Sequence, residues 1–373
     1  MAKDIIDMAT TDNLFQEFAP VTTEAWTKAI ERFLKGKPVS ELNWEIEEGI
    51  NYSPIQRKEN TTPLHINSVS HKSNNNWNIC EKVLVHTTSL EDDAAYQKAN
   101  QIILDALNKG CNALIIELSL LPSTQQLGLL FQNVLVELLH IHFQGEGLTQ
   151  APIAFAKQLK ATAFHKQLKA SFSIPDLTLS SLEEGIQILP KVRWITISVE
   201  TTSTTALSKS LHQASLWIDQ LLNEGKKVEH LSAFFRFEFG VGNQYFVELA
   251  QIRAFKKLWL GLLEGYNAST ADFPQLHATT LSAQEENQYW NMITATTQAM
   301  AAAIGGVDSI YVCPSNGEKD ANDFTKRIAR NVQHLLQSES YLNRVIDPAA
   351  GSYYIENLTA AWIEKSWQQF CNL

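Results

Sequence analysis

The sequence predicts an α/β protein in which a (β/α)8 TIM-type barrel follows an N-terminal helical and extended arm. Three observations lead to this prediction. Eight short β-like runs recur between residues 77 and 313, amphipathic segments separate most of them, and the chain before them combines one short helix with polar, extended sequence. Alternation of strand and helix favours a parallel sheet, and eight such units are the number that a (β/α)8 barrel requires.

The β-like runs are short apolar stretches that match the pattern of strands. They cover residues 77–86, 113–118, 134–143, 169–174, 193–199, 231–239, 274–280 and 309–313. The run at 134–143 can equally extend a preceding helix, which leaves a doubly wound open sheet as the alternative architecture. Between the runs, residues 92–108 and 244–263 carry apolar side chains at helical spacing, as expected of helices that pack on a sheet.

A short amphipathic helix is predicted in the N-terminal arm. Thr22 or Thr23 can cap its first turn, and Gly36 followed by Pro38 ends it. The apolar stripe of this helix has to dock on another surface, and it consists of Trp26, Ile30, Phe33 and Leu34.

Polar sequence connects this helix to the barrel. Residues 51–78 contain two prolines and a Ser-Asn-Asn-Asn cluster, which indicates an extended connection. We therefore divide the chain into an arm of residues 1–75, helix plus extended linker, and a barrel domain of residues 76–373 that ends in a C-terminal helix.

The composition argues against several classes of function. The net charge is −10 and no run of lysine or arginine creates a basic face, so nucleic acid is not an expected partner. No apolar run is long enough to cross a bilayer and the N-terminus lacks the features of a secretory signal, so no membrane association is expected. The four cysteines have no C-x-x-C spacing, which fits reduced thiols in a cytoplasmic protein. They are Cys80, Cys111, Cys313 and Cys371.

Recognisable motifs lie mainly in the last third of the chain. They are DFTKRIARN at residues 323–331, IDPAAGSYYIE at 346–356, FGVGNQYFVELA at 239–250 with Arg253 and Trp259 beyond it, and AIGG at 303–306. Together and in this order, they resemble the methylmalonyl-CoA mutase family, and more specifically its small subunit. The resemblance is strong over residues 190–370, weaker over 77–190 and faint in the arm.

The resemblance implies both a fold and a chemistry. In this family, a TIM-type barrel holds a coenzyme A thioester along its axis. The thioester faces a cobalamin, which is carried by a separate C-terminal α/β domain. The family interconverts methylmalonyl-CoA and succinyl-CoA by a radical rearrangement. The histidine that ligates cobalt belongs to a D-x-H-x-x-G loop, and none of the ten histidines here lies two residues after an aspartate.

Several family positions are altered in this sequence. Catalytic members have a G-Y-H-M-Q-E-A-G-like run after the fifth strand, and here VETTSTTA at 199–206 puts Thr201 where the histidine stands. A hydroxyl cannot supply the protonated imidazole that stabilises charge on the thioester carbonyl. In the R-x-H-x-Q-T-S-G-like run after the seventh strand, His277 survives but the arginine and the glutamine do not. Further on, Thr294 stands where an arginine is expected.

Candidate site residues are therefore few. No catalytic residue is assigned, with His277 the nearest candidate, and His277, Arg327 and Arg330 are the candidates for binding substrate. For His277 the alternative is a structural hydrogen bond, and for the two arginines it is an interface contact or an internal salt bridge. No metal site is expected.

For two further features we expect a structural role, not a binding site. His140 and His142 share one face of a strand, but no carboxylate or cysteine nearby completes a metal site. The segment Gly240-Val241-Gly242 follows a strand and opens a helix, but it lacks the third glycine of a dinucleotide fingerprint.

The expected function follows from the resemblance and its gaps. We expect the small, non-catalytic subunit of an adenosylcobalamin-dependent methylmalonyl-CoA mutase, which pairs with a homologous large catalytic subunit as a heterodimer. Adenosylcobalamin and most contacts with the acyl-CoA are expected on that partner, and no cofactor is expected on this chain. The alternative is an active acyl-CoA mutase barrel that uses a separately encoded cobalamin domain. A piece of a longer subunit is also compatible with the sequence.

Overall fold

A computed structural model describes residues 21–61, 72–87, 89, 91–268, 273–281 and 286–373. The chain divides into two compact units between Gln56 and Arg57, and each is considered by itself. In the part of the chain so described, no helix is both long and apolar enough to span a membrane.

The first unit contains the predicted amphipathic helix, α1 (Thr23–Phe33). The hydroxyl of Thr22 accepts a hydrogen bond from the backbone N–H of Ala25, which caps the helix as the sequence predicts. None of the helix residues is buried, and Phe33 is 90% exposed. A 3-10 turn, η2 (Val39–Leu42), and an antiparallel pair, β1 (Trp44–Glu47) and β2 (Ile50–Tyr52), complete this unit.

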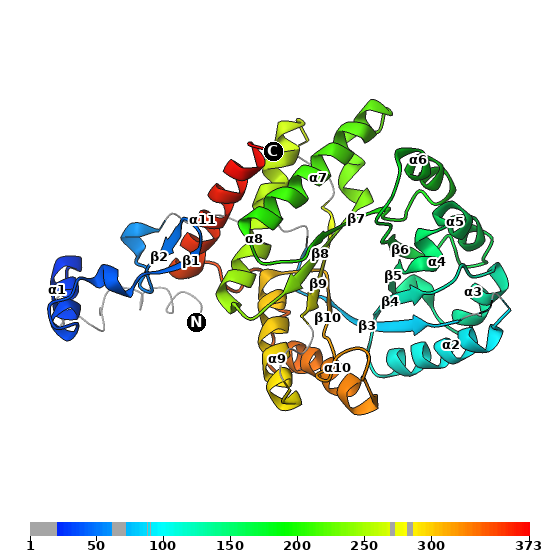
Figure 1. Ribbon diagram of the computed structural model, residues 1–373, viewed down its shortest axis with the longest axis horizontal. Coiled ribbons are helices and arrows are strands. Elements are labelled where there is room, and N and C mark those ends of the chain that lie inside the picture. Colours follow the sequence, from blue (N-terminus) through cyan, green and yellow to red (C-terminus); the bar gives the residue numbers. More distant parts are fainter. Residues whose placement is uncertain (1–20, 62–71, 88, 90, 269–272, 282–285) are drawn as a thin grey trace, which may run out of the picture. The chain divides into compact units, whose positions relative to one another are not determined.

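The second unit is an eight-stranded parallel barrel (Figure 1). Its strands are β3 (Asn78–Val85), β4 (Ala113–Leu118), β5 (His140–Gln144), β6 (Lys169–Phe172), β7 (Ile195–Val199), β8 (Phe235–Val241), β9 (Gln275–Thr280) and β10 (Ser309–Tyr311). The hydrogen-bonded order runs from β6 through β3 and β10 to β7. A parallel bridge between Ser171 and Arg193 joins the two ends of that order.

Helices cover the outside of the ring of strands in Figure 1. They are α2 (Asp93–Asn108), α3 (Thr124–Leu130), α4 (Glu146–Thr149), α5 (Pro152–Lys160), α6 (Leu179–Ile188), α7 (Thr204–Asn223), α8 (Tyr245–Gly265), α9 (Gln288–Gly305), α10 (Asp323–Ser338) and α11 (Tyr353–Phe370). The layer between strands and helices is rich in aromatic side chains. Phe237, for example, lies 4.5 Å from Phe255 and 5.3 Å from Trp259, measured between ring centroids.

The predicted (β/α)8 barrel is thus confirmed, and the open doubly wound sheet is not formed. Two predicted runs begin too early. Residues 136–138 form the 3-10 turn η5 (Val136–Leu138) before β5, and the 3-10 segment η6 (Val228–Phe234) precedes β8. In both runs the apolar residues of the 3-10 segment resemble strand residues, because hydrophobicity alone does not distinguish a turn from a strand.

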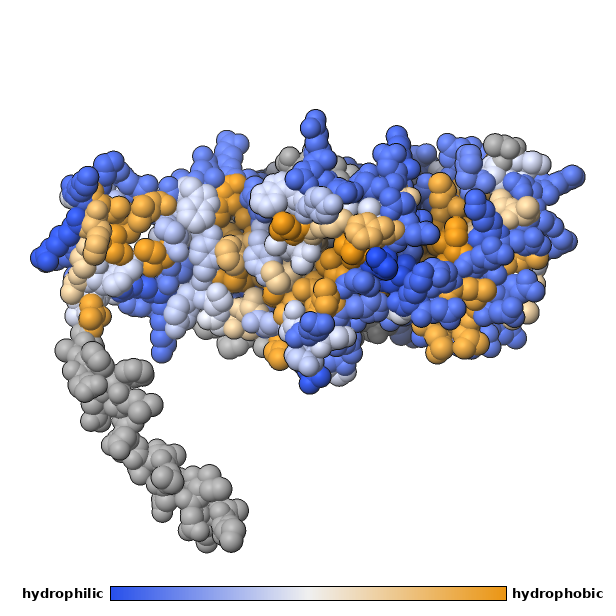
Figure 2. Space-filling view, turned by 90° about the horizontal axis from the view of Figure 1, so that it is seen from below, coloured by the Kyte–Doolittle hydropathy of each residue, from blue (hydrophilic) through white to orange (hydrophobic). Residues whose placement is uncertain are grey.

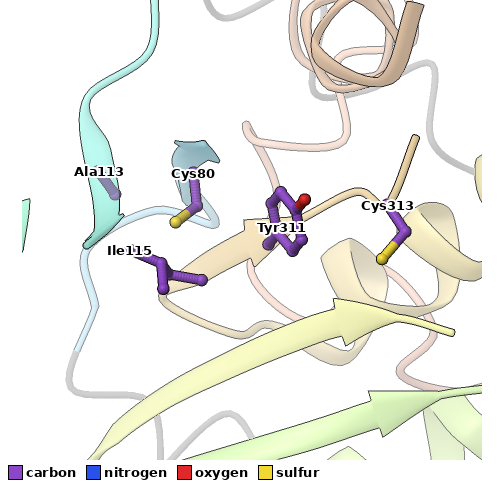
Figure 3. Packing of buried hydrophobic residues seen from close by; sticks show 5 residues of the cluster. All are labelled: Cys80, Ala113, Ile115, Tyr311 and Cys313. Carbon is purple, nitrogen blue, oxygen red and sulfur yellow. The ribbon is translucent and has the colours of Figure 1, made fainter. Parts of the chain in front are cut away.

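A mainly apolar cluster lines one side of the barrel interior, on the adjacent strands β4, β3 and β10 and just after β10 (Figure 3). They form a buried cluster of Cys80, Ala113, Ile115, Tyr311 and Cys313. Burial raises the pKa of the Cys313 thiol to about 12, so it stays protonated and packs as a small apolar group.

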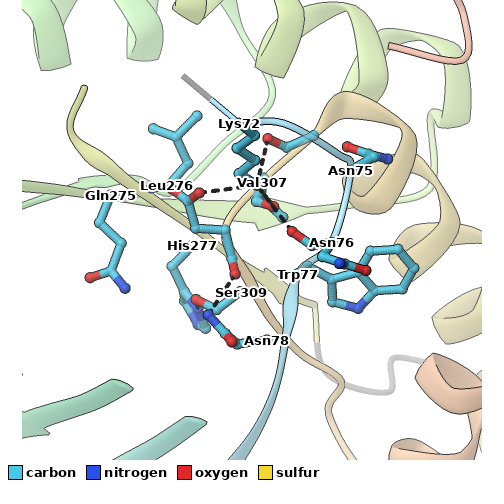
Figure 4. Close-up of polar contacts among 12 residues, drawn as sticks. Lys72, Asn75, Asn76, Trp77, Asn78, Gln275, Leu276, His277, Val307 and Ser309 are labelled. Carbon is cyan, nitrogen blue, oxygen red and sulfur yellow. Dashed lines mark hydrogen bonds and ion pairs between the residues drawn. The ribbon is translucent and has the colours of Figure 1, made fainter. Parts of the chain in front are cut away.

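The segment that enters the barrel is fixed to the end of α9 (Figure 4). The side-chain amide of Asn75 donates to the carbonyl of Ala303 at 2.8 Å and to that of Leu342 at 2.9 Å. Gly306 ends α9 with φ +80°, a conformation that favours glycine. A Cβ there would lie 2.5 Å from Nζ of Lys256 and 3.3 Å from Oδ1 of Asn75, so the AIGG motif has a packing role.

A buried ion cluster joins α8 to the chain after α10. The guanidinium of Arg253, 1% exposed, donates to both carboxylate oxygens of Asp347 at 2.9 Å, to Glu356 at 3.0 Å and to the hydroxyl of Thr359 at 3.0 Å. Glu356 also accepts from the backbone N–H of Gly351 at 2.9 Å. Two of the motifs of the sequence, which are about 100 residues apart, therefore meet in one cluster of charges.

Replacing Arg253 by methionine leaves the carboxylates of Asp347 and Glu356 buried without their cation. We expect Arg253→Met to lower the free energy of unfolding by about 3–5 kcal/mol. Lys109→Met is the matched control, because it removes an exposed pair with Asp105 and costs less than about 1 kcal/mol. Urea unfolding followed by circular dichroism measures both, and equal losses would contradict a special role for Arg253.

Candidate functional site

The centre of the barrel holds a network of charged and polar side chains. His277 on β9 lies between Glu238 on β8 and Ser309 on β10 in the strand register. Its Nδ1 is 2.8 Å from the hydroxyl of Ser309, a bond that Figure 4 shows, and its Nε2 is 3.2 Å from that of Thr279. His277 is 1% exposed, so both ring nitrogens are used inside the protein.

Glu238 connects the guanidinium of Arg236 to the imidazole of His142 across the barrel axis. Its carboxylate accepts a hydrogen bond from Nε of Arg236 at 2.9 Å, and it lies 2.8 Å from Nη2 of the same guanidinium. The Nε2 atom of His142, on β5, is 3.4 Å from the same carboxylate. Because β5 and β8 are not neighbours in the sheet, this contact places the three side chains inside the barrel.

Electrostatics keep the two central histidines neutral. Burial lowers the pKa of His277 and that of His142 well below the ordinary value, and the positive charge of Arg236 lowers both further. Burial raises the pKa of Glu238, but the charge of Arg236 and its hydrogen bond outweigh burial, so the pKa of Glu238 is lowered. The centre thus contains an ionised Arg236–Glu238 pair flanked by neutral imidazoles, which cannot act as proton donors near neutral pH.

Thr201 lies at the C-terminal end of β7, two residues beyond the strand, and its side chain is exposed. The next residue, Thr202, donates from its hydroxyl to the carboxylate of Glu248 on α8 at 2.6 Å. Burial raises the pKa of Glu248 to about 6, against the hydrogen bonds from Thr202 and the backbone N–H of Gly242, which lower it. A Cβ on Gly242 would lie 2.9 Å from Glu248, so glycine leaves room for this carboxyl.

The hydroxyl of Thr294 is occupied within its own helix. It donates to the carbonyl oxygens of Trp290 at 3.3 Å and Asn291 at 3.1 Å. A threonine bound in this way offers no long cationic side chain at the place where an arginine is expected from the resemblance.

The structure does not bring Arg327 and Arg330 together with His277. Arg330 is 7% exposed and forms an ion pair with Glu81 at 2.8 Å on the outer side of β3. The cavity beside it is about 20 Å³, room for no more than one water molecule. Arg327 is exposed and its guanidinium lies 5.6 Å from the ring centroid of Phe324. Both arginines thus make intramolecular contacts, and for Arg330 this is the internal salt bridge given above as the alternative to binding substrate. Binding of substrate by either arginine stays a prediction.

His140 and His142 do share the inner face of β5, as their spacing predicts. His142 is 2.9 Å from the hydroxyl of Ser171, and His140 is 3.4 Å from the amide of Gln275. Within the described ranges, no group of three or more His, Cys, Asp or Glu side chains is arranged to hold a metal ion.

Sequence reasoning missed Arg236 and Glu238, which form the centre of the barrel, and Glu248. The sequence does indicate the pair Arg236 and Glu238, because these two opposite charges lie two residues apart in a strand and each lies between two phenylalanines. That spacing places both side chains on one face of a strand, and this run packs its aromatic residues against α8 on the other face.

Comparison with known proteins gives a family. The model of the family described as methylmalonyl-CoA mutase matches residues 182–373, which is more than half of the chain. The chain belongs to the methylmalonyl-CoA mutase family. The matched region contains the Arg253 cluster and strands β7 to β10 of the barrel.

Individual mutase relatives agree with this. The methylmalonyl-CoA mutase small subunit of Porphyromonas gingivalis is 31% identical over 404 residues, which cover 97% of this chain and 64% of that protein. The small subunit of Streptomyces virginiae is 34% identical over 167 residues, 44% of this chain and 27% of the relative. Methylmalonyl-CoA mutase of Escherichia coli is 36% identical over 151 residues, 38% and 21% of the two chains. The chain thus spans less than two thirds of the length of these mutases.

Glu248 makes stability depend on pH. Its pKa of about 6 in the folded protein exceeds its ordinary value of 4.5, so its contribution to stability is complete below pH 4.5 and is lost as the pH rises through 6. Relative to Glu248→Gln, which does not titrate, the wild-type protein should lose about 2 kcal/mol between pH 4.5 and 7.5.

Urea unfolding of both proteins across this pH range measures the difference. Glu91→Gln, at an exposed position, is the control and should give no such trend. A stability difference between wild type and Glu248→Gln that stays constant with pH would show that folding does not raise the pKa of this carboxyl.

Proposed function

We propose that this chain is the small, non-catalytic subunit of an adenosylcobalamin-dependent methylmalonyl-CoA mutase of the cytoplasm that acts in propionate metabolism. It pairs with a homologous large subunit and stabilises it in a heterodimer. The large subunit binds adenosylcobalamin and most of the acyl-CoA, and it carries out the interconversion of methylmalonyl-CoA and succinyl-CoA.

The observation that carries this proposal is the filled centre of the barrel. A thioester threaded along the axis needs space where Arg236, His142 and His277 lie, and these side chains are 3%, 2% and 1% exposed. They are held by Glu238 and by the hydroxyls of Ser171 and Ser309. Displacing this network would expose a buried ion pair to an apolar pantetheine chain, which is costly.

The side chains at the positions of the family's catalytic residues are also unsuited to the reaction. Thr201 has a hydroxyl that cannot be the imidazolium expected there from the resemblance, and His277 is neutral and bound on both sides. For cobalamin, the 373 residues offer no histidine two positions after an aspartate, so the ligand loop expected from the family has no counterpart in them.

Pairing is supported by the names of relatives and by exposed apolar side chains. Two of the relatives above are named small subunits of a methylmalonyl-CoA mutase. Helix α1 exposes Phe33, and the first two turns of α9 expose Trp290 and Ile293 by 56% and 54%. Figure 2, which views the molecule from the side of α9 and α10, shows apolar residues at the surface among hydrophilic ones. Surfaces of this kind commonly contact a partner.

Co-purification with a mutase large subunit tests the proposal. We expect a tagged form of this chain to retain the large subunit in a stable complex. In assays with adenosylcobalamin and methylmalonyl-CoA, the complex should form succinyl-CoA, and this chain alone should form none.

The same assays include this chain with an added cobalamin-binding domain. Turnover by that mixture would overturn the non-catalytic assignment and favour an active barrel with a separate cobalamin domain. Failure to retain any large subunit, with both chains folded, would overturn the pairing.

The stripe of α1 provides a variant for the interface. We expect Phe33→Asp to weaken retention of the large subunit by at least about tenfold, because a charge in an apolar contact is desolvated without a partner. Leu216→Asp, on α7 and 49% exposed, is the matched control and should leave retention unchanged. If the control loses the large subunit and Phe33→Asp keeps it, the contact does not involve α1.

A further inference from the structure

Helix α9 differs from the other long helices of the barrel because it has no charge. Its 18 residues include no aspartate, glutamate, lysine, arginine or histidine. Every other helix of ten or more residues in the described chain contains at least two charged residues. In Figure 1, α9 lies on the outside of the ring of strands, where a helix is expected to turn charged and polar residues to water. An outer face without charge is typical of a surface that another protein covers.

The exposed residues of α9 form a ridge. Tyr289 and Ile293 are 64% and 54% exposed, and Thr297, four residues further on, is exposed as well. Residues spaced by four lie in a row along a helix, and such rows are the ridges by which helices pack on one another. Trp290, 56% exposed, comes directly after the first residue of the ridge. The ridge is therefore bulky at Tyr289 and narrow at Thr297.

The hydroxyl groups of this face are already hydrogen-bonded within the helix. Thr296 donates to the carbonyl oxygen of Met292 and Thr297 to that of Thr294, both at 2.8 Å. A hydroxyl whose proton is bound inside the protein loses little when water is removed, and on this face no charge has to be desolvated. Covering the ridge with another apolar surface therefore costs little.

The neighbouring helix α10 adds to the apolar area. The strands β9 and β10 are adjacent and parallel, so the helices that follow them, α9 and α10, begin at the same end of the barrel. Phe324, in the first turn of α10, is 47% exposed. With about half of their surface exposed, Tyr289, Trp290 and Phe324 present about 100 Å² each, since an aromatic side chain has about 150–250 Å² in all. A stable pair buries about 800 Å² on each partner, so these three side chains supply more than a third of that area.

A second copy of this chain fits the ridge of α9. Each copy has a net charge of −10 and like-charged molecules repel, so a contact between copies is favoured where neither surface carries charge. A two-fold contact places the same residues on both sides, so α9 meets a helix that is also uncharged. Two ridges of this spacing pack at an angle of about −50°. With Ile293 near the axis, Tyr289 of one copy lies beside Thr297 of the other, a bulky side chain against a small one.

We propose that two copies of this chain associate through α9, in a two-fold contact with Ile293 near its axis and Tyr289 of each copy beside Thr297 of the other. Phe324 on α10 borders this contact. The contact goes beyond the pairing with a large subunit, and it leaves the stripe of α1 to that partner. With both contacts formed, two heterodimers join into one larger assembly.

Sedimentation velocity of the whole chain over a range of concentrations tests the proposal. We expect wild type to sediment as a dimer and Ile293→Asp to weaken the dimer by at least about tenfold, because two carboxylates are desolvated near the axis. Leu138→Asp is the matched control, since Leu138 is 66% exposed on η5, and it should leave the dimer unchanged. Circular dichroism checks that both variants are folded.

A pair of introduced charges tests the two-fold arrangement. Tyr289→Glu and Thr297→Lys should each weaken the dimer, because each buries a charge without a partner. Mixed in equal amounts, the two variants should form a mixed dimer, because the new carboxylate of one copy then lies beside the new ammonium group of the other. If each variant is monomeric and mixing restores no dimer, the arrangement is wrong.

The large subunit separates this contact from the proposed pairing. Ile293→Asp should still retain the large subunit, whereas Phe33→Asp should lose it and remain a dimer of its own copies. The dimer is measured without the large subunit, so a failure of the pairing leaves this test intact. A wild-type chain that is monomeric at every concentration, equal dissociation by Leu138→Asp, or loss of the large subunit by Ile293→Asp would overturn the inference.

Discussion

The guanidinium of Arg253 is the group on which the second half of the barrel depends. It lies in the middle of α8 and binds two carboxylates, one in the connection after α10 and one in α11. Each carboxylate is nearly excluded from water, so neither tolerates burial without this cation. Asp347, with φ +46°, and Gly351, with φ +81°, bend the chain so that both acidic side chains reach it. The motif IDPAAGSYYIE thus folds the chain back so that it packs on α8.

This anchoring lies outside the barrel, and the interior is free to vary. The strands are held by their own hydrogen bonds and by aromatic packing against the helices, so the inner face can carry any side chains that satisfy one another. Here the face combines a small apolar cluster with the pair Arg236–Glu238 and two neutral histidines. The barrel of this chain has a network across its axis in which Nε2 of His142 and Nη2 of Arg236 both face the carboxylate of Glu238.

The sequence predicts the fold better than the site, for physical reasons. Strand and helix patterns depend on local spacing, so β4 at 113–118 and the cap of α1 at Thr22 are found where they are predicted. The early starts predicted for β5 and β8 arise because apolar residues in a turn before a strand have the same sequence pattern as the strand itself. Arg236, Glu238 and His142 form one group only when the barrel closes, since their strands are not all neighbours. For Arg330 the sequence suggests a substrate contact, but in the structure its guanidinium forms an ion pair with Glu81.

The two ends of the barrel follow different electrostatic rules. At the C-terminal ends, Thr201 and Thr294 replace cationic positions expected from the family, and Glu248 is buried with a raised pKa. At the N-terminal ends, cations gather in a chain that is otherwise acidic. The central network of Arg236, Glu238 and His142 lies between the two ends, so side chains that meet on the barrel axis separate Glu248 from the cations.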